Sequence, residues 1–228
     1  MITKVHGLNP AAFFDLDGTL ITVNSGALWM KRERRLGRIS FRQMIQATFY
    51  LVAYKFSVLD MDKVMNKALQ TVKDIPAETV RRWTREWFDE HIARHFAPGA
   101  RPVLDFHRNE NHPLILLTSS SPFESEIACM RFGLDDYISS RYETTAGVLT
   151  GRLIPPSCYG RGKVTWAEKY AAKNEIDLGN SYFYTDSFSD LPMLERVTHP
   201  MVVNPDMRLR RIGKKRQWPI LDWQGPWR

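Results

Sequence analysis

The sequence predicts an α/β fold in which a mostly parallel sheet carries helices on both of its faces. Short apolar runs that suit buried strands occur at residues 11–14, 113–117, 181–185 and 201–204. Helical patterns, with apolar residues three and four positions apart, separate the later runs. Between the first and second runs, residues 23–96 show the helical spacing alone. We therefore expect a sheet-containing core at 1–22 and 97–228, with an inserted helical cap domain at 23–96.

Turn and capping residues predict several individual elements. Pro76 suits the start of a helix that reaches about His95. Residues 137–142 and 148–154 flank the pair Ala146–Gly147 and suggest two strands joined by a turn. A helix over residues 191–197 is expected to follow the strand at 181–185.

The charge of the chain is unevenly distributed. Residues 206–228 hold seven lysines and arginines against two aspartates, so most of the net charge of +7 lies on this segment. Basic segments can bind nucleic acid, but no aromatic-interleaved surface accompanies this one. We expect a solvated helix end and no nucleic-acid partner, with a nucleic-acid-binding module as the alternative.

Cysteine and hydropathy patterns indicate the compartment. Cys129 and Cys158 are too few for a disulfide framework, so we expect a reduced, cytoplasmic setting. No apolar leader with a small-residue cleavage site opens the chain. The most apolar helix-like stretch, residues 44–56, is too short to cross a bilayer, and no transmembrane segment is predicted.

Three of the predicted strands end in carboxylates or hydroxyls: Asp15 with Asp17, Thr118 with Ser119, and Asp186 with Asp190. The carboxyl ends of parallel strands lie along one edge of a sheet, where such sheets bind ligands. Lys163, at the start of a predicted helix, could reach the same edge. Crowded carboxylates repel one another unless a cation intervenes, and Mg²⁺ prefers oxygen ligands. This set of residues suits phosphoryl transfer by a carboxylate nucleophile.

A purely structural interpretation of these residues remains open. Asp-Gly is a common turn pair, as at Asp17–Gly18. Asp186 and Asp190 would suit the N-cap and first turn of the following helix, and Lys163 could be a solvated lysine.

In order and spacing, these residues resemble the four motifs of the haloacid dehalogenase superfamily of phosphohydrolases. The first motif, Asp-x-Asp-x-Thr, matches residues 15–19, and the second, an apolar strand ending in Ser or Thr, matches 114–119. The lysine of the third motif falls on Lys163, and the Asp-x-x-x-Asp of the fourth on 186–190. The subclass with a helical cap after the first motif (subclass IB), typified by phosphoserine phosphatase, is the most similar. The resemblance implies a Rossmann-like core and a Mg²⁺-dependent phosphomonoester hydrolase.

The resemblance also implies the catalytic and metal-binding roles. Asp15 would attack the phosphorus and form an aspartyl-phosphate, while Asp17 would protonate the leaving oxygen and then activate water. An acid role near neutral pH requires the site to raise the pKa of Asp17. Mg²⁺ would be held by the Asp15 carboxylate, the Asp17 backbone carbonyl and Asp186, with Asp190 in support.

Phosphate binding would fall to two motifs. Ser119, Ser120 and Lys163 would hold the phosphoryl oxygens, with Thr118 as the alternative to Ser119. The serines could also be ordinary turn residues.

The cap is expected to select the substrate. Phosphoserine phosphatases carry a glutamate nine residues after the nucleophile, whereas this chain has Asn24. We therefore expect a small metabolite phosphate, such as histidinol phosphate or another phosphorylated alcohol, with phosphoserine or a lipid phosphate as alternatives. The aromatic segment 41–56 would suit a bulky or apolar leaving group. Transfer to an alcohol, or a non-catalytic phosphate-binding regulatory role, remains open, and the sequence does not indicate an oligomeric state.

Overall fold

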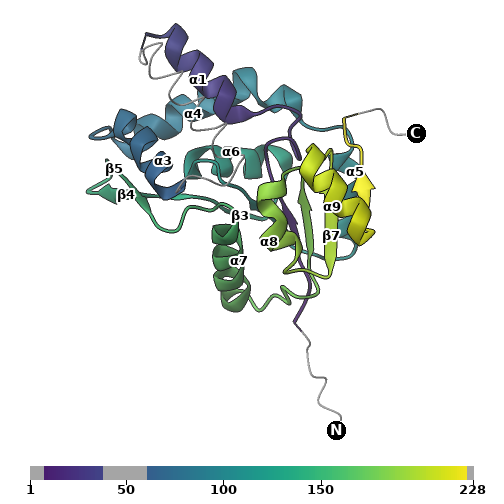
Figure 1. Ribbon diagram of the computed structural model, residues 1–228. Helices are drawn as coiled ribbons and strands as arrows, with labels where there is room; N and C mark the ends of the chain where they lie inside the picture. The colour runs from purple at the N-terminus through teal and green to yellow at the C-terminus, as the bar shows by residue number, and fades with distance from the viewer. Residues whose placement is uncertain (1–7, 38–60, 225–228) are drawn as a thin grey trace.

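A six-stranded parallel sheet forms the centre of the molecule in a computed structural model, which describes residues 8–37 and 61–224 (Figure 1). The strand order is β3-β2-β1-β6-β7-β8, and every neighbouring pair is parallel. The strands are β1 (Ala12–Phe14), β2 (Leu114–Leu117), β3 (Asp136–Ile138), β6 (Tyr182–Thr185), β7 (His199–Val203) and β8 (Ile220–Leu221). The predicted parallel sheet is confirmed, and its strands end along one edge.

Helices cover both faces of the sheet because the central strands are apolar on both sides (Figure 1). Side chains alternate along β1, so that Phe14 packs with Leu104 and Ile127 while Phe13 packs with Trp166 and Leu209. The first face is covered by α5 (Ala100–Asn109) and α6 (Pro122–Phe132). The second is covered by α7 (Arg161–Lys173), α8 (Leu191–Leu194) and α9 (Met207–Arg216). This is the predicted α/β arrangement.

In the described part of the segment between β1 and α5, the regular elements are helices joined by turns and loops. It contains α1 (Ser25–Arg35), α3 (Met61–Leu69), α4 (Ala77–His91) and the 3₁₀ turns η1 (Gln70–Val72) and η2 (Ala93–His95). The helices gather at the upper left of Figure 1, beside one end of the sheet. The apolar stretch expected at 44–56, and the aromatic segment 41–56 with it, lie outside the described residues.

The helix that begins after Pro76 is shorter than predicted. It ends at His91, and residues 93–95 form the separate turn η2. The φ angle of Ile92 is −109°, which departs from the usual helical value although the residue stays in the right-handed helical region, and its side chain is fully buried in the core. The helix thus ends where a side chain enters the core.

The prediction of one strand at 137–142 is wrong. Residues 136–138 belong to the central sheet as β3, whereas β4 (Arg141–Thr145) pairs antiparallel with β5 (Val148–Ile154) in a separate hairpin. Residues 139–140 separate β3 from β4. The Ser140 hydroxyl donates to the Ser119 carbonyl (3.0 Å). Ala146 and Gly147 both have positive φ, as a two-residue hairpin turn requires.

The hairpin joins the helical segment rather than the central sheet. The Leu153 amide donates to the Asn66 side chain (2.7 Å), and the Gln70 side chain donates to the Gly151 carbonyl (2.8 Å). Gly151 has a φ of +77° and lies close to Lys73, which leaves no room for a side chain. Residues from the second half of the chain therefore pack against the helical segment.

The described helices are short. The longest, α4, has 15 residues, and α8 has only four where a helix over 191–197 was expected, because the chain turns after Leu194 to enter β7. Among the described residues, no helix has the length and apolar character needed to cross a membrane.

Candidate active site

The first motif forms a tight loop directly after β1. The Asp15 amide still donates to the Tyr184 carbonyl of β6 (2.9 Å), which holds Asp15 at the sheet edge. One oxygen of Asp17 accepts a hydrogen bond from the Ser25 amide (2.8 Å) at the start of α1. Asp17 therefore connects the sheet edge to the first helix of the cap.

Gly18 allows the first and fourth motifs to meet. Its φ is +71°, and a Cβ at this position would lie 2.3 Å from a carboxylate oxygen of Asp186. Only glycine fits such an approach without displacing Asp186. The loops after β1 and β6 are thereby brought into contact.

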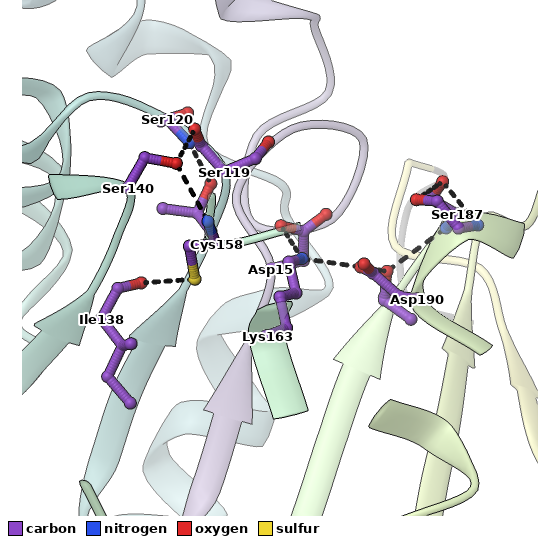
Figure 2. Close-up of polar contacts among 12 residues, drawn as sticks. Asp15, Ser119, Ser120, Ile138, Ser140, Cys158, Lys163, Ser187 and Asp190 are labelled. Carbon is purple, nitrogen blue, oxygen red and sulfur yellow. Dashed lines mark hydrogen bonds and ion pairs between the residues drawn. The ribbon is translucent and has the colours of Figure 1, made fainter. Parts of the chain in front are cut away.

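Lys163 joins two of the predicted carboxylates (Figure 2). Its Nζ lies 2.8 Å from Asp15 and 2.7 Å from Asp190, and its side chain is 2% exposed. Burial alone would lower the pKa of Lys163, but the negative charges of Asp15 and Asp190 outweigh burial and raise it. The ammonium thus stays charged.

The position of Lys163 depends on Gly162. A Cβ on Gly162 would lie 1.8 Å from the Ser157 carbonyl oxygen, so the backbone of α7 passes against the preceding loop at this residue. The Gly162 amide donates to the Tyr159 carbonyl (2.7 Å) in the same turn. The close approach places the next side chain, Lys163, under the sheet edge.

The fourth motif is held by the end of its own strand. The Thr185 hydroxyl donates to the Asp190 oxygen that also accepts from Lys163 (2.7 Å). The other Asp190 oxygen is buried and has no hydrogen-bond partner among the described residues. A buried oxygen without a partner is costly, so a ligand or water is expected to satisfy it.

Burial and mutual repulsion shift the carboxylates of the site. Burial raises the pKa of Asp15 to about 7, although Lys163 opposes the shift, and burial raises the pKa of Asp186 to about 8 with the help of Asp15 and Asp190. The pKa of Asp17 is also raised, again by burial first. The raised value for Asp17 suits the acid role that the sequence requires of it.

The donor set fits a hard cation. The cluster of carboxylates around Lys163 carries more negative charge than one ammonium can neutralise, and it offers only oxygen ligands. Within the described ranges, no three His, Cys, Asp or Glu side chains form a ready-made metal cage. A cation here could use the oxygens of Asp15, Asp186 and Asp190 that Lys163 does not contact, together with backbone or water oxygens.

The serines of the second motif lie on the loop beside Asp15 (Figure 2). Both side chains are half-buried, and in the described structure neither forms a hydrogen bond to Asp15 or Lys163. Thr118 is buried and accepts a hydrogen bond from the Ser120 amide (3.2 Å), so it braces the loop. Ser119 and Ser120 are therefore more exposed than Thr118.

Comparison with known proteins identifies the family. The family model of haloacid dehalogenase-like hydrolases matches residues 12–195. The chain belongs to the haloacid dehalogenase-like hydrolase family. The resemblance inferred from the four motifs is confirmed, and the chain is an enzyme of the hydrolase class whose relatives include proteins named as phosphatases.

Relatives of this hydrolase cover nearly its whole length. It is 29% identical to a histidinol-phosphatase of Neisseria meningitidis serogroup C over 93% of this chain and 98% of that protein. It is also 29% identical to a phosphoserine phosphatase of Mycobacterium tuberculosis strain H37Rv, over 95% of this chain and 72% of that one. A crystal structure of a Bordetella pertussis Tohama I protein of unknown function matches with a TM-score of 0.85 and 27% identity, covering 94% and 99% of the two chains.

Sequence reasoning missed three residues at the site of this haloacid dehalogenase-like hydrolase. Thr185 holds Asp190, and Ser25 supplies the amide that holds Asp17. Thr185 directly precedes Asp186 at a strand end, and this position in the sequence was a signal that its hydroxyl could contact the site. Glu124 resembles an ordinary acid in the first turn of α6, and only the structure shows that it is buried beside Asp17.

Proposed function

We propose that this protein is a Mg²⁺-dependent phosphomonoester hydrolase that acts through an aspartyl-phosphate intermediate on Asp15. The observation that carries the proposal is the buried contact of Lys163 with Asp15 and Asp190 at the sheet edge, beside Asp186. A protein that only binds phosphate would not need a buried carboxylate held at the phosphate position by a lysine. The regulatory alternative is therefore the weaker one.

The chemistry follows from the positions of two aspartates. An Asp15 oxygen would bond to phosphorus while the ester P–O bond breaks, and the leaving oxygen would take a proton from Asp17. Asp17 would then remove a proton from the water that cleaves the aspartyl-phosphate. The raised pKa of Asp17 supports the first step, and Lys163 keeps its positive charge throughout.

The residues that would hold Mg²⁺ are the Asp15 carboxylate, the Asp17 carbonyl and Asp186, with Asp190 in support. The ion would supply Lewis-acid stabilisation of the charge on the phosphoryl oxygens. Ser119, Ser120 and Lys163 would bind the same oxygens as hydrogen-bond donors.

Several features support a small metabolite phosphate as substrate, with histidinol phosphate or another phosphorylated alcohol as the first candidate. One relative is named a histidinol-phosphatase and another a phosphoserine phosphatase. The Asn24 side chain accepts a hydrogen bond from the Ala27 amide (2.8 Å) as the N-cap of α1, so it is engaged within the helix. Phosphoserine and lipid phosphates remain alternatives, as does transfer of the phosphoryl group to an alcohol.

We also propose the domain boundaries predicted from the sequence, with the cap at 23–96 and the core at 1–22 and 97–228. In support, the two connecting segments lie side by side. The Thr22 amide donates to the His95 carbonyl (2.9 Å), and the Ala97 amide donates to the Leu20 carbonyl (2.8 Å). A cytoplasmic setting remains part of the proposal and agrees with two buried, free cysteines.

The test measures phosphate release from a panel of phosphomonoesters with Mg²⁺, for the wild type and Asp15→Asn. The panel contains phosphoserine, histidinol phosphate, a lipid phosphate and p-nitrophenyl phosphate. We expect Asp15→Asn to lose nearly all activity while its circular dichroism spectrum is unchanged. Wild-type rates in that variant would contradict the nucleophile assignment, and phosphoserine as the best substrate by a wide margin would contradict the substrate class.

A further inference from the structure

Glu124 is a buried carboxylic acid that the proposed mechanism does not use. It lies in the first turn of α6 and is 7% exposed, and its Oε1 has no hydrogen-bond partner among the described residues. A first-turn acid that only stabilised the helix dipole would lie in solvent. Burial of an unpartnered carboxyl is costly, so this one requires another explanation.

Asp17 and Ser25 are two polar neighbours of Glu124. The negative charge of Asp17 repels that of Glu124, and the Ser25 hydroxyl lies close to both acids. That hydroxyl is also buried, and in the described structure it makes no hydrogen bond of normal geometry. Two unpartnered polar groups therefore flank the residue that would protonate the leaving oxygen.

The carboxyl of Glu124 lies where the cap meets the core. The adjacent Phe123 packs with Val80 of α4 and Leu149 of β5, and its ring meets that of Tyr142 edge-on at 6.1 Å. The Glu124 charge also raises the pKa of Tyr142, after the larger effect of burial. Glu124 thus lies near Ser25 of α1 and Tyr142 of the hairpin, where these elements meet α6.

Glu124 and Ser25 are called the Glu124 subsite below, and within 8–37 and 61–224 no basic side chain is paired with it. The Glu124 carboxyl is 7% exposed and its Oε1 has no hydrogen-bond partner among the described residues, so a negative charge there is unfavourable without a partner. A cation brought by the substrate would remove that cost.

We propose that Glu124 and Ser25 form a subsite that binds a cationic, hydrogen-bond-donating group on the leaving alcohol, such as an ammonium or an imidazolium. The inference rests on the proposed function, because proton transfer from Asp17 to the leaving oxygen places the leaving group beside this subsite. Glu124 would then select among phosphoesters without taking part in the bond changes. Such a role deepens the proposed function from small phosphoesters to those whose alcohol carries a basic nitrogen.

The experiment compares two matched esters, 2-aminoethyl phosphate and ethyl phosphate, which differ by the ammonium group. The measured quantity is the ratio of their kcat/KM values at pH 7 within each variant, so that a general loss of activity cancels. We expect the wild type to favour the amino ester by about 10-fold or more, the range of a charge-assisted hydrogen bond. Glu124→Gln, which keeps the size of the side chain, is expected to bring the ratio close to one.

Two further variants make the result specific. Glu126→Gln changes an acid on the same helix that instead pairs with Arg81 (2.9 Å), and it should leave the ratio unchanged. Ser25→Ala keeps the backbone amide that holds Asp17 and should lower the ratio by a smaller factor than Glu124→Gln. If Glu124→Gln fails to fold, as judged by circular dichroism, the ratio measured for Ser25→Ala decides whether the subsite exists.

The possible outcomes separate the two proposals. Hydrolysis of p-nitrophenyl phosphate by a wild type that shows no preference for the amino ester would overturn the subsite and leave the phosphatase proposal standing. A preference that survives in both Glu124→Gln and Ser25→Ala would overturn the subsite as well. Absence of activity on every ester with Mg²⁺ would remove the phosphatase proposal and the subsite with it.

Discussion

Lys163 and Asp15 are 148 positions apart in the sequence, yet they form a 2.8 Å ion pair in which the lysine is 2% exposed. The same ammonium contacts Asp190 at 2.7 Å. A buried charge with two partners is maintained only while both partners are present. A change at Lys163, Asp15 or Asp190 is therefore expected to alter the stability of the protein as well as its site.

Replacing Lys163 tests this coupling. Lys163→Met is expected to destabilise the protein by about 3–5 kcal/mol in urea unfolding, because Asp15 and Asp190 would be left buried without a cation. The variant Lys163→Met/Asp190→Asn should regain part of the loss, since one uncompensated carboxylate is removed. Lys173→Met, at the exposed end of the same helix, is the control and should change stability by less than about 0.5 kcal/mol. Equal stability of Lys163→Met and the control would contradict the buried ion pair.

The raised carboxyl pKa values predict how pH and metal act on stability. Asp186 has an ordinary pKa of 3.8 and a folded value of about 8, so between these values the folded protein retains a proton that the unfolded chain has lost. Asp15, with a folded pKa of about 7, acts in the same direction. Stability of the metal-free protein is therefore expected to fall as pH rises from about 5 to 8.

Thermal melts in EDTA and in Mg²⁺ measure this effect. We expect Mg²⁺ to raise Tm more at pH 8 than at pH 5, because a bound cation stabilises the ionised carboxylates. Asp186→Asn should flatten the pH dependence in EDTA and weaken the response to Mg²⁺. A metal-free protein whose Tm rises from pH 5 to pH 8 would show that the sign is wrong.

Gly162→Ala tests the close backbone approach that places Lys163. A methyl group 1.8 Å from the Ser157 carbonyl oxygen must displace the start of α7, at a cost of about 1–3 kcal/mol in stability. Activity should fall by at least about 10-fold, because Lys163 moves with the backbone. Gly213→Ala makes the same change inside α9, where the added carbon would meet only contacts of 3.6 Å. That control should leave activity unchanged and stabilise the protein slightly.

Thr185→Val tests the brace on Asp190. Loss of the 2.7 Å hydrogen bond, with an apolar group in its place, is expected to cost about 1–3 kcal/mol and to lower kcat more than it changes KM. Thr165→Val removes an exposed hydroxyl that donates only within α7, and it serves as the control. A change in KM alone would show that Thr185 does not position Asp190.

The sequence predicted the parts of the fold that local patterns specify. Apolar runs such as 114–117 became central strands because they suit a sheet that is buried on both faces. The strand at 137–142 was predicted wrongly because its residues favour extended backbone in either of two sheets. Which sheet they join depends on contacts with distant parts of the chain. The Ser140 hydroxyl donates to the Ser119 carbonyl, and β5 is hydrogen-bonded to Asn66 of α3.

By itself, the sequence determined which residues are candidates for the site, since motif order and spacing suffice to find Asp15, Lys163 and Asp186. Only the tertiary structure decided how their charges are arranged, because the pairing of Lys163 with Asp15 and Asp190 depends on the close approaches at Gly18 and Gly162. It also distinguished Glu124 from an ordinary helix acid. Burial depends on packing between distant segments, so a local pattern does not indicate which acidic side chain will be removed from solvent.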